Sequence, residues 1–166
     1  MSSINYDLKK IKAFVFDIDG VLSPSVIPMD AQGAPVRMLN VKDRYAIGKA
    51  LKEGFHIGII TGAKTFPVRV YYENLGVRHL YMDSANKYVD FEDFLTATGV
   101  EIDEVVFSGD DIPDLQIAKK VGLSVAPADA AYEIRNVAKY ISQLNGGEGI
   151  AREVIEEVLR AQDLWL

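Results

Sequence analysis

The stretch that decides the fold covers residues 13–21 and reads Ala13-Phe14-Val15-Phe16-Asp17-Ile18-Asp19-Gly20-Val21. Its four leading apolar residues predict a buried β-strand, and two acids follow where that strand ends. Side chains alternate along an extended chain, so Asp17 and Asp19 are expected to point to the same side. Gly20 lets the backbone turn sharply and approach a ligand closely. Two carboxylates at the end of a buried strand are costly unless a metal or a reaction uses them, and we therefore predict a functional site here.

The whole chain has the size and composition of one globular domain. With 166 residues and no low-complexity tract, residues 1–166 are expected to form a single domain with a substantial core. The formal net charge of -6 argues against nucleic acid or an anionic membrane as the main partner. The absence of cysteine excludes disulfides and thiolate metal sites. No stretch resembles a signal peptide or a membrane span, so a cytoplasmic enzyme or binding protein is expected.

Short apolar runs alternate with segments of helical periodicity along most of the chain. The predicted strands cover residues 11–16, 56–60, 79–82, 105–108, 123–126 and 140–142. The predicted helices cover residues 46–53, 65–75, 88–97, 113–121, 130–138 and 150–161. Strands and helices that alternate in this way predict an α/β fold of the Rossmann-like kind, a doubly wound parallel sheet with helices on both faces.

One stretch, residues 23–41, breaks this alternation. It holds the apolar pairs Val26-Ile27 and Met38-Leu39 around the turn-like sequence Asp30-Ala31-Gln32-Gly33, which predicts a β-hairpin inserted after the first strand. The insertion is far too short for a second domain. Its apolar surface favours pairing with another subunit over exposure to water, so an oligomer is expected.

Polar side chains also follow the later strands. Thr61-Gly62 comes after the second strand, Lys87 shortly after the third, and Asp110-Asp111 after the fourth, with Asp114 three residues further on. Ligands bind parallel sheets at the carboxyl ends of their strands, so these groups are expected to meet at one edge. Taken singly they have simpler interpretations: Thr61 could cap a helix, Lys87 could be a solvated lysine, and the acids could cap the helix that follows. Their convergence is what predicts a site.

This inventory suits the transfer of a phosphoryl group to a carboxylate. A nucleophilic acid approaches phosphorus against mutual negative charge, which a hard divalent cation neutralises; Mg²⁺ prefers carboxylates, water and phosphate as ligands. A hydroxyl, backbone N–H groups and an ammonium would hold the remaining phosphoryl oxygens. A second acid would protonate the leaving alcohol and then activate water.

Four motifs of the chain resemble those of the haloacid dehalogenase superfamily of phosphatases: Asp17-x-Asp19-Gly20-Val21, Thr61-Gly62, Lys87 and Gly109-Asp110-Asp111-x-x-Asp114. The resemblance covers nearly the whole chain in the right order. Three further stretches narrow it to the capless members that act on sugar acid phosphates: Asn40-Val41-Lys42-Asp43, residues 122–130 and Gly146-Gly147-Glu148-Gly149. That branch implies a sheet with a hairpin and no cap domain, and homotetramers in which neighbouring subunits help to cover each active site.

The resemblance also implies a role for each matching residue. Asp17 would be the nucleophile and Asp19 the general acid and base, while Thr61, Gly62 and Lys87 would bind the phosphoryl group. Mg²⁺ would be held by Asp17, Asp110 and the backbone carbonyl of Asp19. A further acid, Asp111 or Asp114, would support them. Gly147 and Glu148 would lie near a substrate site, either in the same subunit or in a neighbour.

The expected substrate, by the same resemblance, is 3-deoxy-D-manno-octulosonate 8-phosphate, a precursor of lipopolysaccharide. Two departures weaken that assignment: Ala63 stands where the family commonly has arginine, and Arg44 where it usually has glycine. Arg44 or Lys64 could offer a cation to the sugar carboxylate. A nonulosonate or sialic acid 9-phosphate is the alternative substrate. The alternative of another class is a non-catalytic, receiver-like module that stores phosphate on an aspartate.

Overall fold

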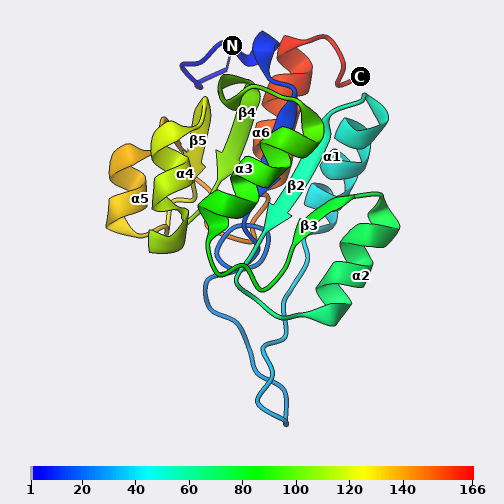
Figure 1. The fold of residues 1–166 in the computed structure, drawn as a ribbon, viewed down its shortest axis with the longest axis vertical. Coiled ribbons are helices and arrows are strands. Elements are labelled where there is room, and N and C mark those ends of the chain that lie inside the picture. Colours follow the sequence, from blue (N-terminus) through cyan, green and yellow to red (C-terminus); the bar gives the residue numbers. More distant parts are fainter. Residues whose placement is uncertain (1) are drawn as a thin grey trace.

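The computed structural model describes residues 2–166 and shows one six-stranded parallel sheet with helices on both faces (Figure 1). The strands are β1 (Ala13–Phe16), β2 (His56–Ile60), β3 (His79–Tyr81), β4 (Val105–Ser108), β5 (Leu123–Ala126) and β6 (Tyr140–Ile141). The helices are α1 (Val41–Lys52), α2 (Phe66–Leu75), α3 (Lys87–Thr98), α4 (Leu115–Lys120), α5 (Tyr132–Val137) and α6 (Ile150–Ala161). Within residues 2–166 no helix combines the length and the apolar character that crossing a membrane requires.

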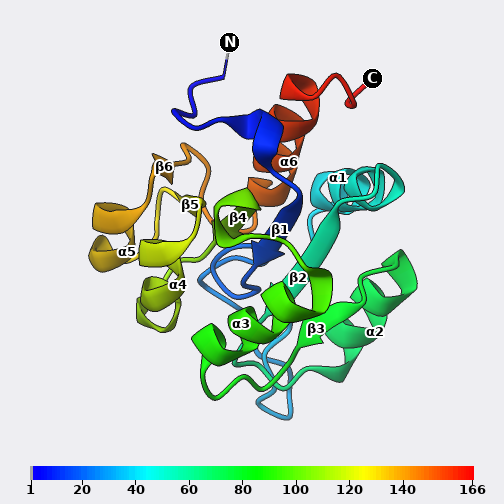
Figure 2. The ribbon, with the colours of Figure 1, turned by 45° about the horizontal axis from the view of Figure 1, so that its top comes forward.

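The core forms two layers on either side of the sheet. Helices α1, α2 and α6 pack against one face, and α3, α4 and α5 against the other. Strand β1 lies in the middle and contributes to both layers, with Phe14 and Phe16 in the first and Ala13 and Val15 in the second. Figures 1 and 2 show the C-terminus at the end of the molecule opposite the loop that follows β1.

The strand order β3-β2-β1-β4-β5-β6 places the site. Strand β1 pairs in parallel with β2 on one side and with β4 on the other, so the chain reverses its direction of travel across the sheet next to β1. In such sheets a crevice forms at this reversal, outside the carboxyl ends of the strands. Asp17 follows Phe16 directly and therefore lies at that crevice.

The predicted doubly wound parallel sheet is confirmed, and the main differences concern where helices begin. Helix α1 begins at Val41, five residues before the predicted start, because the Asn40 side chain accepts the backbone N–H of Lys42 and caps the helix. The predicted helix over residues 113–121 is divided into a 3₁₀ turn (Ile112–Asp114) and α4. Apolar periodicity carries no information about either feature, since both depend on polar capping groups.

The predicted hairpin is a chain reversal without strands; we call residues 23–40 the arm. Met29 and Pro35 form an antiparallel bridge, and the N–H of Val36 donates to the Pro28 carbonyl at 2.8 Å. Three prolines in the arm, Pro24, Pro28 and Pro35, lack the N–H that a regular ladder needs. Figure 1 shows the arm projecting from the carboxyl edge of the sheet. The arm therefore carries exposed apolar side chains but no strand that could pair with another chain.

Helices α1 and α6 are joined by a buried acid. Asp43, in the first turn of α1, is 2% exposed, and its Oδ1 accepts the backbone N–H of Arg152 at 2.7 Å. Its Oδ2 has no hydrogen-bond partner among the described residues. Burial raises the pKa of Asp43 to about 6, against the partial opposition of Arg152.

The raised pKa of Asp43 predicts a loss of stability on raising the pH. The folded protein keeps a proton that the unfolded chain releases near pH 3.8, so the free energy of unfolding should fall between about pH 4 and pH 6. This one group accounts for up to about 3 kcal/mol of that fall. Asp43→Asn removes the titration, so its stability relative to the wild type should improve from pH 4 to pH 7. Urea unfolding of both proteins across this range tests the prediction; a difference independent of pH would contradict it.

Candidate active site

A pocket of about 850 Å³ opens at the carboxyl edge of the sheet. It is lined by residues that follow β1, β2 and β4, by the start of α3 and by the arm. Of the residues predicted for the site, those in its lining are Asp17, Asp19, Thr61, Gly62, Lys87, Asp110 and Asp111. Asp17 and Asp111 are 94 residues apart in the chain, yet both line this pocket, because the parallel sheet brings the ends of its strands to one edge.

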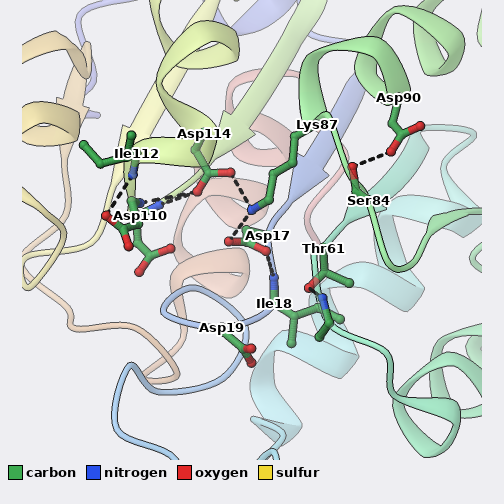
Figure 3. A network of polar contacts seen from close by, with 12 residues as sticks. Asp17, Ile18, Asp19, Thr61, Ser84, Lys87, Asp90, Asp110, Ile112 and Asp114 are labelled. Atoms are coloured by element: carbon green, nitrogen blue, oxygen red, sulfur yellow. Dashed lines mark hydrogen bonds and ion pairs between the residues drawn. The ribbon is translucent and has the colours of Figure 1, made fainter.

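An ion-pair triad joins two residues of this lining, Asp17 and Lys87, to the fully buried Asp114. The Nζ atom of Lys87 lies 2.7 Å from Asp17 Oδ2 and 2.7 Å from Asp114 Oδ1, as Figure 3 shows. Lys87 is the first residue of α3, and the Asn86 side chain fixes that helix start by accepting the N–H of Tyr88 at 3.1 Å. All three charged groups are buried. The helix start therefore holds an ammonium next to the acid that follows β1.

Asp114 also organises the loop after β4. Its Oδ2 accepts the backbone N–H of Asp110 at 3.0 Å, while its Oδ1 accepts from Lys87. Asp111 behaves differently, because it is exposed and its side chain accepts the N–H of Ile112 at the start of the 3₁₀ turn. Of the two acids that the sequence left as alternatives beside Asp110, the structure places Asp114 in the cluster and Asp111 at a cap.

Three acids, two from the pocket lining and the buried Asp114 next to it, are arranged as cation ligands. One oxygen each of Asp17, Asp110 and Asp114 lies within 4.8 Å of the others. Burial raises the pKa of Asp17 well above its ordinary value, and Asp114 raises it further against the opposing charge of Lys87. Burial and Asp114 raise the pKa of Asp110 to about 7. The cluster holds more negative charge than one lysine offsets, and a hard divalent cation with oxygen ligands would stabilise it.

Gly20 makes this arrangement possible. Its φ is +83°, and a Cβ built on it would lie 1.9 Å from Asp110 Oδ2. A side chain here would have to displace the carboxylate of Asp110 or the loop that carries Gly20. The glycine of the opening motif is therefore needed for the close approach of the acid from β4.

Thr61 shapes the turn after β2 and does not cap a helix. It is 2% exposed, its Oγ1 accepts the N–H of Ala63 at 3.1 Å, and its carbonyl accepts the N–H of Ser84 at 2.9 Å. Helix α2 begins later, with Thr65 as the N-cap residue. Thr61 lines the pocket, which is the position expected of a residue that contacts phosphate.

The residues predicted for the sugar lie outside this pocket. Arg44 lines a separate hollow between α1 and the starts of β2 and β3. Lys64 is exposed and forms an ion pair with Asp83 at 3.1 Å. Gly147 braces the loop after β1 through an N–H bond to a backbone carbonyl, and Glu148 accepts an N–H within its own loop. None of these four residues belongs to the lining of the acid pocket.

Sequence reasoning missed Arg37. The arm brings its guanidinium to Asp19, with Nε 2.9 Å from Oδ1 and Nη2 2.9 Å from Oδ2. The Arg37 side chain is only 9% exposed although its neighbour Met38 is exposed. A lone arginine between two apolar residues gives no signal of a pocket in the sequence; only the path of the arm reveals it.

Comparison with known proteins agrees with this geometry. The chain is 38% identical to the 3-deoxy-D-manno-octulosonate 8-phosphate phosphatase KdsC of Escherichia coli K12 over 154 residues, which are 93% of this chain and 82% of that protein. Residues 79–154 match the haloacid dehalogenase-like hydrolase family. This chain belongs to that family and is a phosphatase. The family resemblance is confirmed, and a non-catalytic receiver-like module is set aside.

Solved structures of similar proteins share the fold of this phosphatase. The 3-deoxy-D-manno-octulosonate 8-phosphate phosphatase of Yersinia pestis aligns with a TM-score of 0.91 and 33% identity over 96% of this chain and 86% of that one. The Moraxella catarrhalis protein, in complex with magnesium, phosphate and KDO, aligns with a TM-score of 0.90 and 29% identity over 96% and 91% of the two chains. A Haemophilus influenzae relative at 26% identity and a TM-score of 0.90, covering 96% and 93%, binds cobalt. Phosphatases of this family thus use a divalent metal, and the acid cluster offers the ligands for one.

The contact between Gly20 and Asp110 predicts the effect of one added methyl group. Gly20→Ala should weaken the binding of a divalent metal by at least about tenfold, because the Cβ displaces one of the three acids. Gly33→Ala is the matched control, since Gly33 has φ +81° but no atom within 4 Å of its Cβ position. Both variants carry the backbone strain of a left-handed alanine. Calorimetric titration with Mg²⁺ tests the difference; equal affinities would show that the contact is unimportant.

Proposed function

We propose that this phosphatase is Mg²⁺-dependent and hydrolyses the phosphate monoester of an acidic sugar, with 3-deoxy-D-manno-octulosonate 8-phosphate as the leading substrate. The observation that carries the proposal is the triad of Lys87 with Asp17 and Asp114, set beside Asp110 at the carboxyl edge of the sheet. It supplies a nucleophile, a cation and metal ligands within one pocket. The names of the E. coli and Yersinia relatives support the substrate.

Asp17 attacks the phosphorus atom and forms an aspartyl-phosphate, while the sugar leaves as an alcohol that takes a proton from Asp19. Asp19 then accepts a proton from a water molecule that attacks the same phosphorus, which releases phosphate and restores Asp17. Lys87, the Thr61 hydroxyl and the backbone N–H of Gly62 hold the phosphoryl oxygens while their charge shifts.

The acid cluster supports the metal ligands that the family resemblance implies. Asp17, Asp110 and the backbone carbonyl of Asp19 would hold Mg²⁺, with Asp114 in support. Mg²⁺ supplies positive charge that lets the carboxylate of Asp17 approach an anionic ester. Mg²⁺ usually keeps several water ligands and binds only a few carboxylate oxygens. It therefore suits a cluster in which the protein supplies only part of the coordination shell.

The assembly is proposed as a homotetramer with active sites near subunit interfaces. The arm carries exposed apolar side chains, among them Val26 at 87% and Met29 at 71% exposure. The arm itself projects from the edge of the sheet that holds the pocket (Figure 1). Association would bury them and bring a neighbouring chain close to the pocket.

The substrate is tested by comparing kcat/KM for octulosonate 8-phosphate and for nonulosonate 9-phosphates, with Mg²⁺ present. The proposal expects the octulosonate ester to be the better substrate. A preference for the nine-carbon esters would replace the substrate but keep the reaction. No phosphate release from any sugar acid phosphate would overturn the proposed function.

Asp17→Asn tests the nucleophile. The change keeps the shape of the side chain but removes the attacking carboxylate, so kcat should fall by at least about 10³-fold. Phosphate release with octulosonate 8-phosphate and Mg²⁺ measures it, and circular dichroism verifies the fold. Near-normal turnover would rule out the proposed attack.

Asp19→Asn tests the proton transfer. In this variant phosphoenzyme should form slowly and persist, which intact-protein mass spectrometry after acid quenching would detect.

Two adjacent acids provide a matched test of the metal site. Asp110 belongs to the acid cluster, whereas Asp111 caps the 3₁₀ turn at the pocket rim. Asp110→Asn should therefore raise the Mg²⁺ concentration needed for half-maximal activity by at least about tenfold, and Asp111→Asn should change it by less than about threefold. Activity measured against Mg²⁺ concentration after treatment with a chelator separates them. Similar shifts in both variants would contradict the ligand assignment.

A further inference from the structure

Arg37 is the one cation in the pocket lining that the chemistry at phosphorus does not occupy. Among the described residues that line the pocket, only Lys87 and Arg37 are basic. Lys87 is held between Asp17 and Asp114 and is committed to the phosphoryl end. Arg44 and Lys64, the cations suggested by the sequence, lie outside the lining. A second anionic group on a substrate would meet Arg37 as its nearest available cation within this chain.

The position of Arg37 corresponds to the leaving sugar. In the proposed mechanism Asp19 exchanges a proton with the leaving alcohol, so the sugar lies against the carboxylate of Asp19. The guanidinium of Arg37 contacts both oxygens of that carboxylate at 2.9 Å. Arg37 therefore borders the sugar end of the pocket.

The ion pair leaves part of the guanidinium free. An arginine side chain has five N–H donors in a planar fork. Asp19 uses the edge formed by Nε and Nη2, and no residue within 2–166 accepts a hydrogen bond from Nη1. The remaining edge, formed by Nη1 and Nη2, has the geometry that binds a carboxylate with two parallel hydrogen bonds. Arg37 can thus hold Asp19 and a second carboxylate at once.

The base of the arm fixes Arg37 in place. The N–H of Met38 donates to Oγ of the fully buried Ser23 at 3.2 Å, which ties the chain next to Arg37 to the first residue of the arm. The Arg37 side chain is 9% exposed and has given up most of its hydration. A preorganised and partly dehydrated guanidinium binds an anion more strongly than a solvated one does, because less water and less motion are lost on binding.

We propose that Arg37 selects acidic substrates: one edge of its guanidinium positions Asp19, and the free edge binds a carboxylate of the leaving sugar. This inference rests on the proposed function and adds to it the residue that recognises the acid.

The test compares an acidic with a neutral substrate in matched variants. For the wild type, Arg37→Gln, Arg37→Lys and Arg160→Gln, kcat/KM is measured with octulosonate 8-phosphate and with arabinose 5-phosphate, which has no carboxylate. Arg160 is a suitable control because it also pairs with a carboxylate, Glu156, but lies on α6 outside the pocket. The ratio of the two kcat/KM values measures selection for the acid.

In Arg37→Gln this ratio should fall by roughly 10- to 100-fold, mainly through a higher KM for the acidic substrate, as expected for the loss of one charged pair. Arg37→Lys should restore part of the ratio, and Arg160→Gln should keep the wild-type value. Should Arg37→Gln fail to fold, as judged by circular dichroism, Arg37→Lys still has to lower the ratio by several-fold, because an ammonium cannot bind both carboxylates in a planar fork.

Three results would overturn the inference. An equal loss on both substrates would mean that Arg37 only positions Asp19. An unchanged ratio would mean that the acid is recognised elsewhere, for instance by a neighbouring subunit. A wild type without preference for the acidic ester would remove the selection that Arg37 is proposed to provide. If the wild type instead prefers another sugar acid phosphate, the leading substrate is wrong, and the same ratio with that ester and a neutral one decides the role of Arg37.

Discussion

The ion pair of Lys87 with Asp17 and Asp114 is the constraint on which the rest of the site depends. Burying three charged groups costs several kcal/mol for each ion, and close contacts offset that cost only if the geometry is good. Here one ammonium lies 2.7 Å from an oxygen of each acid. Asp110 adds a further acid to the same cluster, and the pKa values of Asp17 and Asp110 are raised first by burial and then by the negative charge of Asp114. Such a cluster does not by itself stabilise the fold. A ligand that brings positive charge would stabilise it and explains why these acids lie together.

The sheet makes this unfavourable cluster possible. Strand β1 is fully buried between β2 and β4, and its two neighbours hold the loop after it at a fixed place. The chain can then hold Asp17 rigidly at the crevice, where α3 delivers Lys87 and the loop after β4 delivers Asp110. Gly20 has no side chain that would collide with the carboxylate of Asp110. The free energy for holding like charges together comes from the apolar layers on both faces of the sheet, remote from the pocket.

The sequence predicts the residues that meet around the acid cluster better than it predicts Arg37, for a physical reason. Acids and hydroxyls that follow apolar strands must meet at one edge once the strands are parallel, so local patterns place Asp17, Thr61 and Lys87 without further information. The arm obeys no such rule. Its prolines prevent the strand pairing that its apolar pattern predicts, and the position of Arg37 follows from a tertiary hydrogen bond at Ser23. The charge of Arg44 suits a sugar carboxylate, but α1 places this residue in another hollow.

This division also bears on how such an enzyme changes its substrate. The groups proposed to act on phosphorus are anchored in the strand ends and the helix start, where a change disturbs the buried charges. Arg37, the group proposed to lie beside the leaving sugar, comes from the arm, most of which is exposed and has few contacts with the two core layers. Substitutions in the arm can therefore alter recognition of the sugar at little cost to the fold. Selection among acidic sugars can vary through Arg37 and its neighbours while the reaction at Asp17 stays the same, and for that reason motifs at the strand ends identify the reaction more firmly than the substrate.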